Sequence, residues 1–195
     1  MRSPKARPYR KSKRAEEEER TRARIVDAAE ALHGSLGPSR TSISAVAEEA
    51  GVTRATVYRH FPDDESLFLA CSSQWLERQP VPDPNTWTSY DEPTARLRAA
   101  LTEIYRYYRA GEPMITLVQR DADAVPERVR QGRLEQEQQW IGTLLQPFPG
   151  RRRKTLRAAV AHAGAFTTWR SLCVVEGLSD RAAADLMVGM VTAAS

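Results

Sequence analysis

The chain has 195 residues, and a composition of 41% hydrophobic and 28% charged residues is typical of a folded protein, not of a wholly disordered one. No run approaches the roughly 18 uninterrupted apolar residues that a membrane-spanning helix requires, and the basic N-terminus continues into polar sequence where a secretory signal would have an apolar core. We therefore expect a cytoplasmic protein that binds no membrane.

The formal net charge of +4 is unevenly distributed along the chain. Residues 1–14 hold seven bases and no acid, which leaves 22 bases against 25 acids in the remainder, a net charge of −3. We expect residues 1–15 to form a disordered basic arm that meets an anionic partner, with nucleic acid as the first candidate. The alternative is a solvated tail that only aids solubility.

Helical patterns follow one another along the chain, and no segment shows the alternation of a strand. The first helix is predicted over residues 16–36, where apolar residues recur at helical spacing and four glutamates lie in the first turn. Gly37-Pro38 ends it. A short helix over residues 43–50 follows, with Thr41 or Ser42 as its N-cap.

Thr53 is the predicted cap of the next helix, over residues 53–61. A longer helix begins at Asp64, its predicted N-cap, and four prolines over residues 80–93 then predict a loop. Five more helices are predicted beyond this loop, over residues 97–108, 114–118, 125–146, 151–176 and 179–195. The fold is therefore predicted to be all-α, with a three-helix head over residues 16–62 and a six-helix body over residues 63–195.

The segment from Ile43 to Pro62 has the spacing of a helix-turn-helix. Ala47 is small where the second helix crosses closely, Gly51 suits a left-handed residue at the turn, and Val57 is the apolar anchor of the second helix. Two ordinary packed helices are the alternative. The outward face of the second helix carries hydroxyl and guanidinium groups that suit phosphates and base edges, from Thr53, Arg54, Thr56, Tyr58 and Arg59.

The residues from Ala47 to Pro62, followed by Asp64-Glu-Ser-Leu67, closely resemble the DNA-binding head of TetR-family transcriptional regulators. The likeness is specific over residues 25–68 and is one of architecture over the body. The resemblance implies an all-α homodimer whose two heads bind a palindromic operator on double-stranded DNA. It implies a repressor, released from the operator by a small-molecule effector.

The family's DNA contacts can be carried over one position at a time. Phosphate contacts fall on Thr56 and Tyr58, and base-reading positions fall on Arg54, Ala55 and Arg59. Two threonines lie as caps near the DNA backbone, and one histidine packs or contacts the backbone at the end of the recognition helix: Thr41, Thr53 and His60.

The sequence differs from the family pattern at Asp64, where family members often carry a lysine that contacts phosphate. A carboxylate at this position repels the DNA backbone, and the basic arm is a candidate source of replacement contacts, in a minor groove for example. Asp64 and the near-neutral body leave a second function open, that of a helical ligand-binding or scaffold protein whose head no longer binds DNA.

The body carries more large side chains than a plain helical core requires. They are spread over several predicted helices, as expected for an apolar cavity with few polar anchors. We expect a flat, largely apolar or aromatic effector to contact Tyr105, Tyr108, Met114, Leu117, Trp140, His162 and Phe166. For each of these residues, the alternative is a place in a filled core.

The last two predicted helices are rich in small and apolar residues. Ala161 and Gly164 lie on the first, and Leu186 and Met190 on the second. Paired across a two-fold axis, these helices would form a four-helix bundle, so we expect a homodimer held by them. The alternative is that their apolar faces only close the core of the monomer.

No pattern indicates catalysis or a bound metal. His33, His60 and His162 lack the spacing of a metal site, and the sequence has neither a glycine-rich phosphate loop nor a nucleophile elbow. Cys71 and Cys173 lie far apart among apolar residues, which favours buried reduced thiols over a redox-sensing pair. We expect no enzyme activity, no cofactor and no metal.

Overall fold

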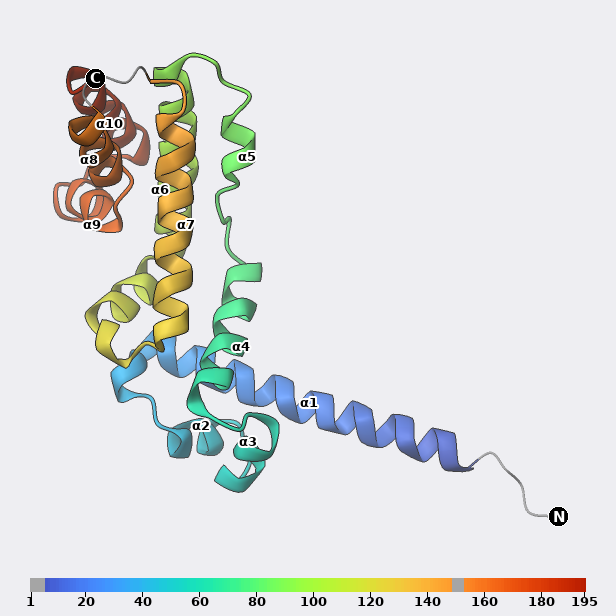
Figure 1. The fold of residues 1–195 in the computed structure, drawn as a ribbon. Coiled ribbons are helices and arrows are strands. Elements are labelled where there is room, and N and C mark those ends of the chain that lie inside the picture. Colours follow the sequence, from blue (N-terminus) through green and yellow to red (C-terminus); the bar gives the residue numbers. More distant parts are fainter. Residues whose placement is uncertain (1–5, 149–152) are drawn as a thin grey trace. The chain divides into compact units, whose positions relative to one another are not determined.

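The computed structural model describes residues 6–148 and 153–195, and for residues 6–12 and 153 only the backbone. Within these ranges helices are joined by turns and loops, and no strand occurs (Figure 1). The predicted all-α fold class is confirmed.

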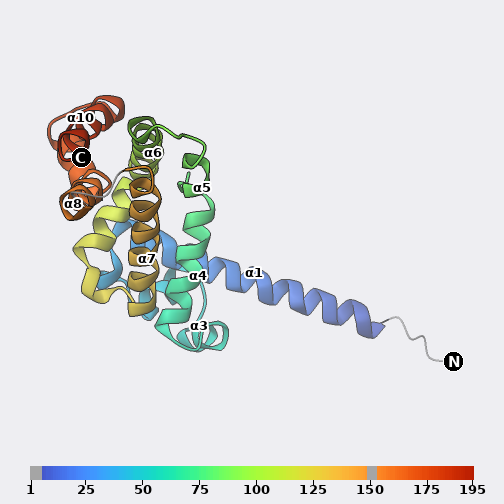
Figure 2. The same ribbon diagram turned by 45° about the horizontal axis from the view of Figure 1, so that its top comes forward.

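The chain divides into two compact units, whose helices are drawn in Figures 1 and 2. The head unit extends to Arg78 and includes Thr116–Pro126, and the body unit comprises Gln79–Ile115 and Glu127–Ser195. This division differs from the expected boundary after residue 62.

The head unit contains four helices whose apolar faces meet in one core. They are α1 (Ala6–Ser35), α2 (Ile43–Glu49), α3 (Arg54–His60) and α4 (Asp64–Glu77), with a 3₁₀ turn η1 (Pro38–Arg40) between α1 and α2. Ile25, Val46, Val57 and Leu67, one from each helix, are buried in this core. Helix α4 belongs to the head because Leu67 and Cys71 are buried there, which accounts for the shifted boundary.

Side chains cap the N-termini of two head helices. Ser42, one of the two residues expected to cap α2, does so, because its Oγ accepts a hydrogen bond from Ala45 N at 3.2 Å. Asp63, not Asp64, caps α4, because its Oδ1 accepts from Ser66 N at 2.7 Å. Asp64 is instead the first residue of α4 and is exposed.

Helix α1 begins ten residues earlier than predicted, at Ala6. The expected disordered arm over residues 1–15 is therefore wrong for residues 6–15, while residues 1–5 lie outside the described residues. Lysine and arginine have good helix propensity, so a basic segment can continue a helix that Glu16 to Glu19 were expected to open.

The body unit contains the remaining helices. They are α5 (Pro84–Trp87), most of α6 (Pro93–Arg120), α7 (Glu127–Leu145), α8 (Arg153–Ala163), α9 (Phe166–Trp169) and α10 (Asp180–Ala193). A 3₁₀ turn η2 (Ala122–Ala124) follows α6, and a π-helical turn η4 (Arg170–Val175) continues α9. The short α5 lies in the expected loop because Trp87 is fully buried and its Nε1 donates to Glu103 Oε2 at 2.9 Å.

Helix α6 runs unbroken where two helices were predicted, over residues 97–108 and 114–118. Pro113 lies inside it and removes one backbone hydrogen bond. The helix continues because its apolar side stays buried on both sides of the proline, at Tyr108 and Ile115.

The single helix predicted over residues 151–176 is instead broken after Ala163. The break leaves two backbone carbonyls without partners along the helix, and tyrosine hydroxyls on α6 supply them. Tyr105 Oη donates to Ala163 O, and Tyr108 Oη donates to Gly164 O, each at 2.7 Å.

Candidate nucleic-acid interface

Helices α2 and α3 meet at the tight turn that the motif predicts. Gly51 has a φ of 63°, the left-handed conformation expected at that position. Val52 N donates to Ala47 O at 2.9 Å, and the side chain of Val57 is 0% exposed. The helix-turn-helix geometry is confirmed, with Val57 anchoring α3 to the head core.

Helix α3 presents a polar face on the side away from Val57. Arg54, Ala55, Tyr58 and Arg59 are exposed, and their spacing of i, i+1, i+4 and i+5 places them on one side of the helix. Two guanidinium groups and a phenol on one face suit guanine edges and phosphate oxygens. The structure therefore brings four of the predicted DNA contacts together.

Thr53 and Thr56 form a cap at the start of α3. Thr53 Oγ1 accepts a hydrogen bond from Thr56 N at 3.1 Å, which confirms the predicted cap. The two hydroxyl oxygens lie 2.9 Å apart, so one hydroxyl donates to the other. Whichever hydroxyl donates, the other hydroxyl keeps its O–H free to donate a hydrogen bond to a phosphate oxygen.

Thr41 and His60, the other two predicted DNA contacts, are less available to DNA than the exposed residues of α3. Thr41 Oγ1 donates to the carbonyl of Gly37 at 2.9 Å, so its hydroxyl is used in the turn before α2. His60 is half-buried at the end of α3, and its Nε2 is buried without a hydrogen-bond partner among the described residues. Their assignment to DNA contact stays a prediction.

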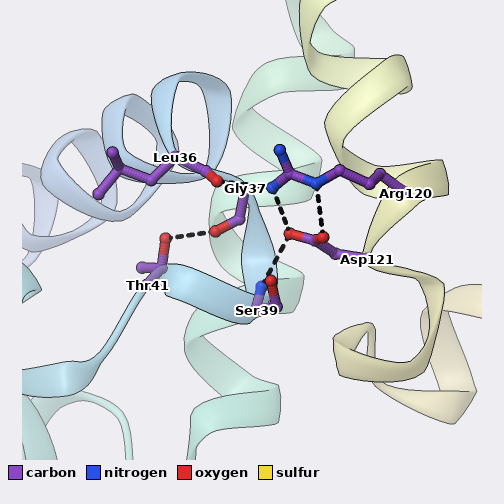
Figure 3. A network of polar contacts seen from close by, with 6 residues as sticks. All are labelled: Leu36, Gly37, Ser39, Thr41, Arg120 and Asp121. Carbon is purple, nitrogen blue, oxygen red and sulfur yellow. Dashed lines mark hydrogen bonds and ion pairs between the residues drawn. The ribbon is translucent and has the colours of Figure 1, made fainter.

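A polar network joins the end of α1 to the end of α6 within the head unit (Figure 3). Arg120 Nη2 donates to Leu36 O at 2.7 Å, and Ser39 N donates to Asp121 Oδ2 at 3.1 Å. Arg120 and Asp121 form an ion pair, with 2.8 Å between Nε and Oδ1. The Arg120 guanidinium holds the pKa of Asp121 well below its usual range, so the carboxylate stays ionised.

Gly37 is the residue that permits this network. Its φ is 90°, and a Cβ built at this position would collide with Arg120 Nη2 and Asp121 Oδ2. Sequence reasoning recognised Gly37 as the end of the helix but missed Arg120 and Asp121. The glycine signals a close approach, yet the partner comes from more than 80 residues along the chain.

A second missed feature is the buried pair of His33 on α1 and Cys71 on α4. Cys71 Sγ lies 3.4 Å from His33 Nδ1, and the imidazole ring lies 4.7 Å from the ring of Phe68, centroid to centroid. Burial lowers the pKa of His33 to about 4 and raises the pKa of Cys71 to about 12. At neutral pH both side chains are therefore uncharged.

The predicted effector contacts do not all lie in one unit. Leu117 belongs to the head unit and is half-buried, and His162 is exposed. The other five belong to the body unit: Tyr105, Tyr108, Met114, Trp140 and Phe166. Burial raises the pKa of both tyrosines, whose hydroxyls are used as donors to backbone carbonyls.

Aromatic rings in the body unit form one connected group. Tyr108 packs edge-on against Phe166, with ring centroids 5.3 Å apart, and Trp140 packs edge-on against Tyr107 and Trp87. Trp140 Nε1 is buried and has no hydrogen-bond partner among the described residues. Such a donor would gain from a polar acceptor brought by a ligand or by water.

The last helix has two apolar sides with different surroundings. Ala183, Met187 and Val191 of α10 are buried in the body unit. Leu186 and Met190 of the same helix are 47% and 52% exposed. The expectation that these faces form an interface and the alternative that they close the core therefore concern different sides of α10.

None of the helices in the described part of the chain is both long and apolar enough to cross a membrane. No group of three or more His, Cys, Asp or Glu side chains in that part of the chain is placed to hold a metal ion.

Residues 25–71 match the family model for bacterial regulatory proteins of the tetR family. This segment runs from the first buried isoleucine of α1 to Cys71 on α4, and so includes the whole helix-turn-helix. This part of the chain is thus similar in sequence to the tetR family of bacterial regulatory proteins.

Curated transcriptional regulators are similar to a short part of the chain. The chain is 44% identical over 55 residues to the HTH-type transcriptional regulator TtgR of Pseudomonas putida, and 44% identical over 56 residues to AcrR of Shigella flexneri. These matches cover 28% and 29% of this chain and 26% of each relative. The matched part thus spans about a quarter of the length of these relatives.

Solved structures are similar over nearly the whole chain. NalD of Pseudomonas aeruginosa, described as the secondary repressor of the MexAB-OprM multidrug efflux pump, has a TM-score of 0.64 at 20% identity, over 92% of this chain and 97% of its own. A TetR-like regulator from Rhodococcus sp. RHA1 has a TM-score of 0.61 at 20% identity, over 88% and 93%. At this identity the likeness shows a shared fold.

Proposed function

We propose that the chain is a sequence-specific DNA-binding regulator of transcription, a repressor that binds a palindromic operator as a homodimer and is released by a small apolar molecule. The exposed face of α3 carries this proposal. Arg54 and Arg59 stand one and a half turns apart on a helix of the family's DNA-binding domain, with Tyr58 between them. Arginine pairs bidentately with guanine, and each such pair contributes about 1–3 kcal/mol of discrimination.

The palindrome follows from the symmetry of a homodimer. Two heads related by a two-fold axis meet matching half-sites, about 34–36 Å apart when one helical turn separates them. Leu186 and Met190 leave an apolar strip on α10, and Val174 and Val175 of η4 are 42% and 65% exposed. Exposed apolar groups of this kind favour a second copy of the chain as the partner.

The effector is proposed to bind among the aromatic rings of the body. The Nε1 of Trp140, which has no hydrogen-bond partner within the described ranges, and the neighbouring rings suit a flat molecule with an acceptor group. NalD, named as a repressor of a multidrug efflux pump, has the same fold and makes apolar compounds a sensible first set to screen. Such a compound releases DNA only if it binds more tightly to the conformation that the body has in the DNA-free protein.

Selection from a random-sequence duplex library, followed by mobility shifts, tests the DNA-binding proposal. We expect the unmutated chain to enrich a palindrome, and Arg54→Ala or Arg59→Ala to lower the preference for it by about tenfold or more. Tyr58→Phe should weaken binding to all duplexes evenly. Arg157→Ala, an exposed arginine on α8, is the matched control.

Two results would contradict this assignment. If both arginine variants keep the full preference for the selected palindrome, α3 does not read the bases through these side chains. If the unmutated chain shifts no duplex even at low salt, the alternative holds, and the chain is a ligand-binding or scaffold protein with a TetR-like head.

A further inference from the structure

Helix α1 is much longer than the head needs. It spans 30 residues, and the first of its described side chains to be buried is Ile25. Side chains 13–20 are all exposed, so this part of α1 adds no buried residue to the head core. Both views show this part of α1 leading away from the other head helices (Figures 1 and 2).

The contact between Arg22 and Phe61 fixes where α1 leaves the head. The Arg22 guanidinium lies over the Phe61 ring, 4.9 Å from its centroid, and Phe61 directly follows α3. At about 1.5 Å per residue, Arg14 lies roughly 12 Å and Arg7 roughly 22 Å further along the helix. The outer end of α1, residues 6–14, thus begins roughly 12 Å, or just over two helical turns, beyond the contact with Phe61.

The charge along α1 is segregated. Arg7, Arg10, Lys11 and Arg14 recur at i, i+3, i+4 and i+7, positions that share one side of a helix, and no acid precedes Glu16. Residues 16–19 are four glutamates, which separate this basic end from the head. Apolar side chains of any size are nearly absent from residues 6–24, where Tyr9 is the largest.

This pattern selects one class of partner. A helix that binds a membrane surface needs an apolar face, and one that pairs with another helix needs an apolar stripe. The outer end of α1 offers neither, and offers instead a concentrated positive charge. A phosphate backbone is the partner that matches it.

We propose that the outer end of α1, residues 6–14, is a second DNA contact that grips phosphates flanking the half-site bound by α3. This inference rests on the proposed DNA-binding function. A helix holds these lysine and arginine residues at a set distance from α3, which a flexible tail would not do. The glutamates at 16–19 repel the duplex next to the head, so the contact is confined to the flank.

Phosphate contacts of this kind change the salt dependence of binding and leave sequence preference alone. Each phosphate neutralised adds about 0.9 to the slope of log affinity against log salt. The test uses the full chain with Arg7, Arg10, Lys11 and Arg14 all changed to Gln, which keeps helix propensity. If each of the four side chains contacts one phosphate, we expect the slope to fall by about 3.6 per chain and the affinity at 150 mM salt to fall at least about tenfold.

The matched control removes the same number of positive charges from the exposed surface of the body, with Arg106, Arg128, Arg157 and Arg181 changed to Gln. This control should keep the slope, and circular dichroism should confirm that both variants remain helical. The preference for the selected palindrome over random duplex should be the same in all three proteins. A footprint should shrink at its outer edges in the α1 variant alone.

Several outcomes would overturn the inference. If the α1 variant keeps the salt slope and footprint of the unmutated chain while Arg54→Ala still relaxes sequence preference, the flanking contact is wrong and the proposed function stands. Equal losses in the α1 variant and the body control mean that net charge alone matters. A chain that binds no duplex overturns both proposals.

Discussion

At the scale of single residues, the head is sensitive to acid through one histidine. His33 is buried between α1 and α4, against Phe68 and 3.4 Å from the sulfur of Cys71. Burial lowers its pKa from about 6.5 to about 4 in the folded protein. The unfolded chain therefore binds a proton more readily than the folded chain does.

The sign of the pH effect follows from this difference. Between pH 6.5 and pH 4 the unfolded state takes up the proton first, so the free energy of unfolding falls as the pH falls. The shift corresponds to roughly 3 kcal/mol if it is fully realised. Urea unfolding at fixed protein concentration, at pH 7 and pH 5, should show the loss.

Substitution identifies the group responsible. His33→Gln should lower stability at pH 7, since it disturbs a buried pair, but should flatten the dependence between pH 7 and pH 5. His162→Gln, at an exposed site on α8, is the control and should keep the slope of the unmutated chain. An unchanged slope in the His33 variant would show that another group governs the acid response.

At the scale of helices, the break between α8 and α9 depends on α6. The hydroxyls of Tyr105 and Tyr108 donate to the two carbonyls that the break leaves free. Tyr105→Phe should lower the free energy of unfolding by about 1–3 kcal/mol, because a buried carbonyl then lacks a partner. Thermal or urea unfolding measures this directly.

The control for this prediction is Tyr90→Phe, because the side chain of Tyr90 is 44% exposed. It should change stability by less than about 0.5 kcal/mol. If the two variants lose the same small amount of stability, the tyrosine hydroxyls do not hold the end of α8.

At the scale of the whole molecule, assembly depends on an apolar strip that the body leaves uncovered. Leu186 and Met190 point away from the core that Met187 and Val191 fill. Leu186→Glu combined with Met190→Glu should convert a dimer to a monomer at micromolar concentration, because two charges would be buried at the interface. Sedimentation velocity distinguishes the two species.

Leu134→Glu supplies the matched control, since Leu134 on α7 is 56% exposed and equally apolar. It should sediment like the unmutated chain. A monomeric unmutated chain would contradict the proposed assembly, and so would a dimer that survives both charges on α10.

Periodicity and turn residues were enough to predict the all-α class, the helix-turn-helix and the exposed face of α3. These features depend on short-range spacing: Gly51 at a left-handed turn, Val57 as the buried anchor of α3, and Thr53 as a cap. Residues a few positions apart interact through the backbone that joins them. Their arrangement therefore follows from periodicity and turn chemistry.

Other features were decided by tertiary structure, because each depends on residues distant in the chain. The short helix α5 forms in the expected loop because Trp87 is buried and donates a hydrogen bond to Glu103. Helix α6 continues through Pro113 because residues on both sides of the proline are buried. Arg96 is buried where its guanidinium donates to carbonyl oxygens, including Thr143 O at the end of α7. The free energy gained by burying these side chains outweighs the intrinsic secondary-structure propensity of the local sequence. Which residues are buried together is visible only in the folded chain.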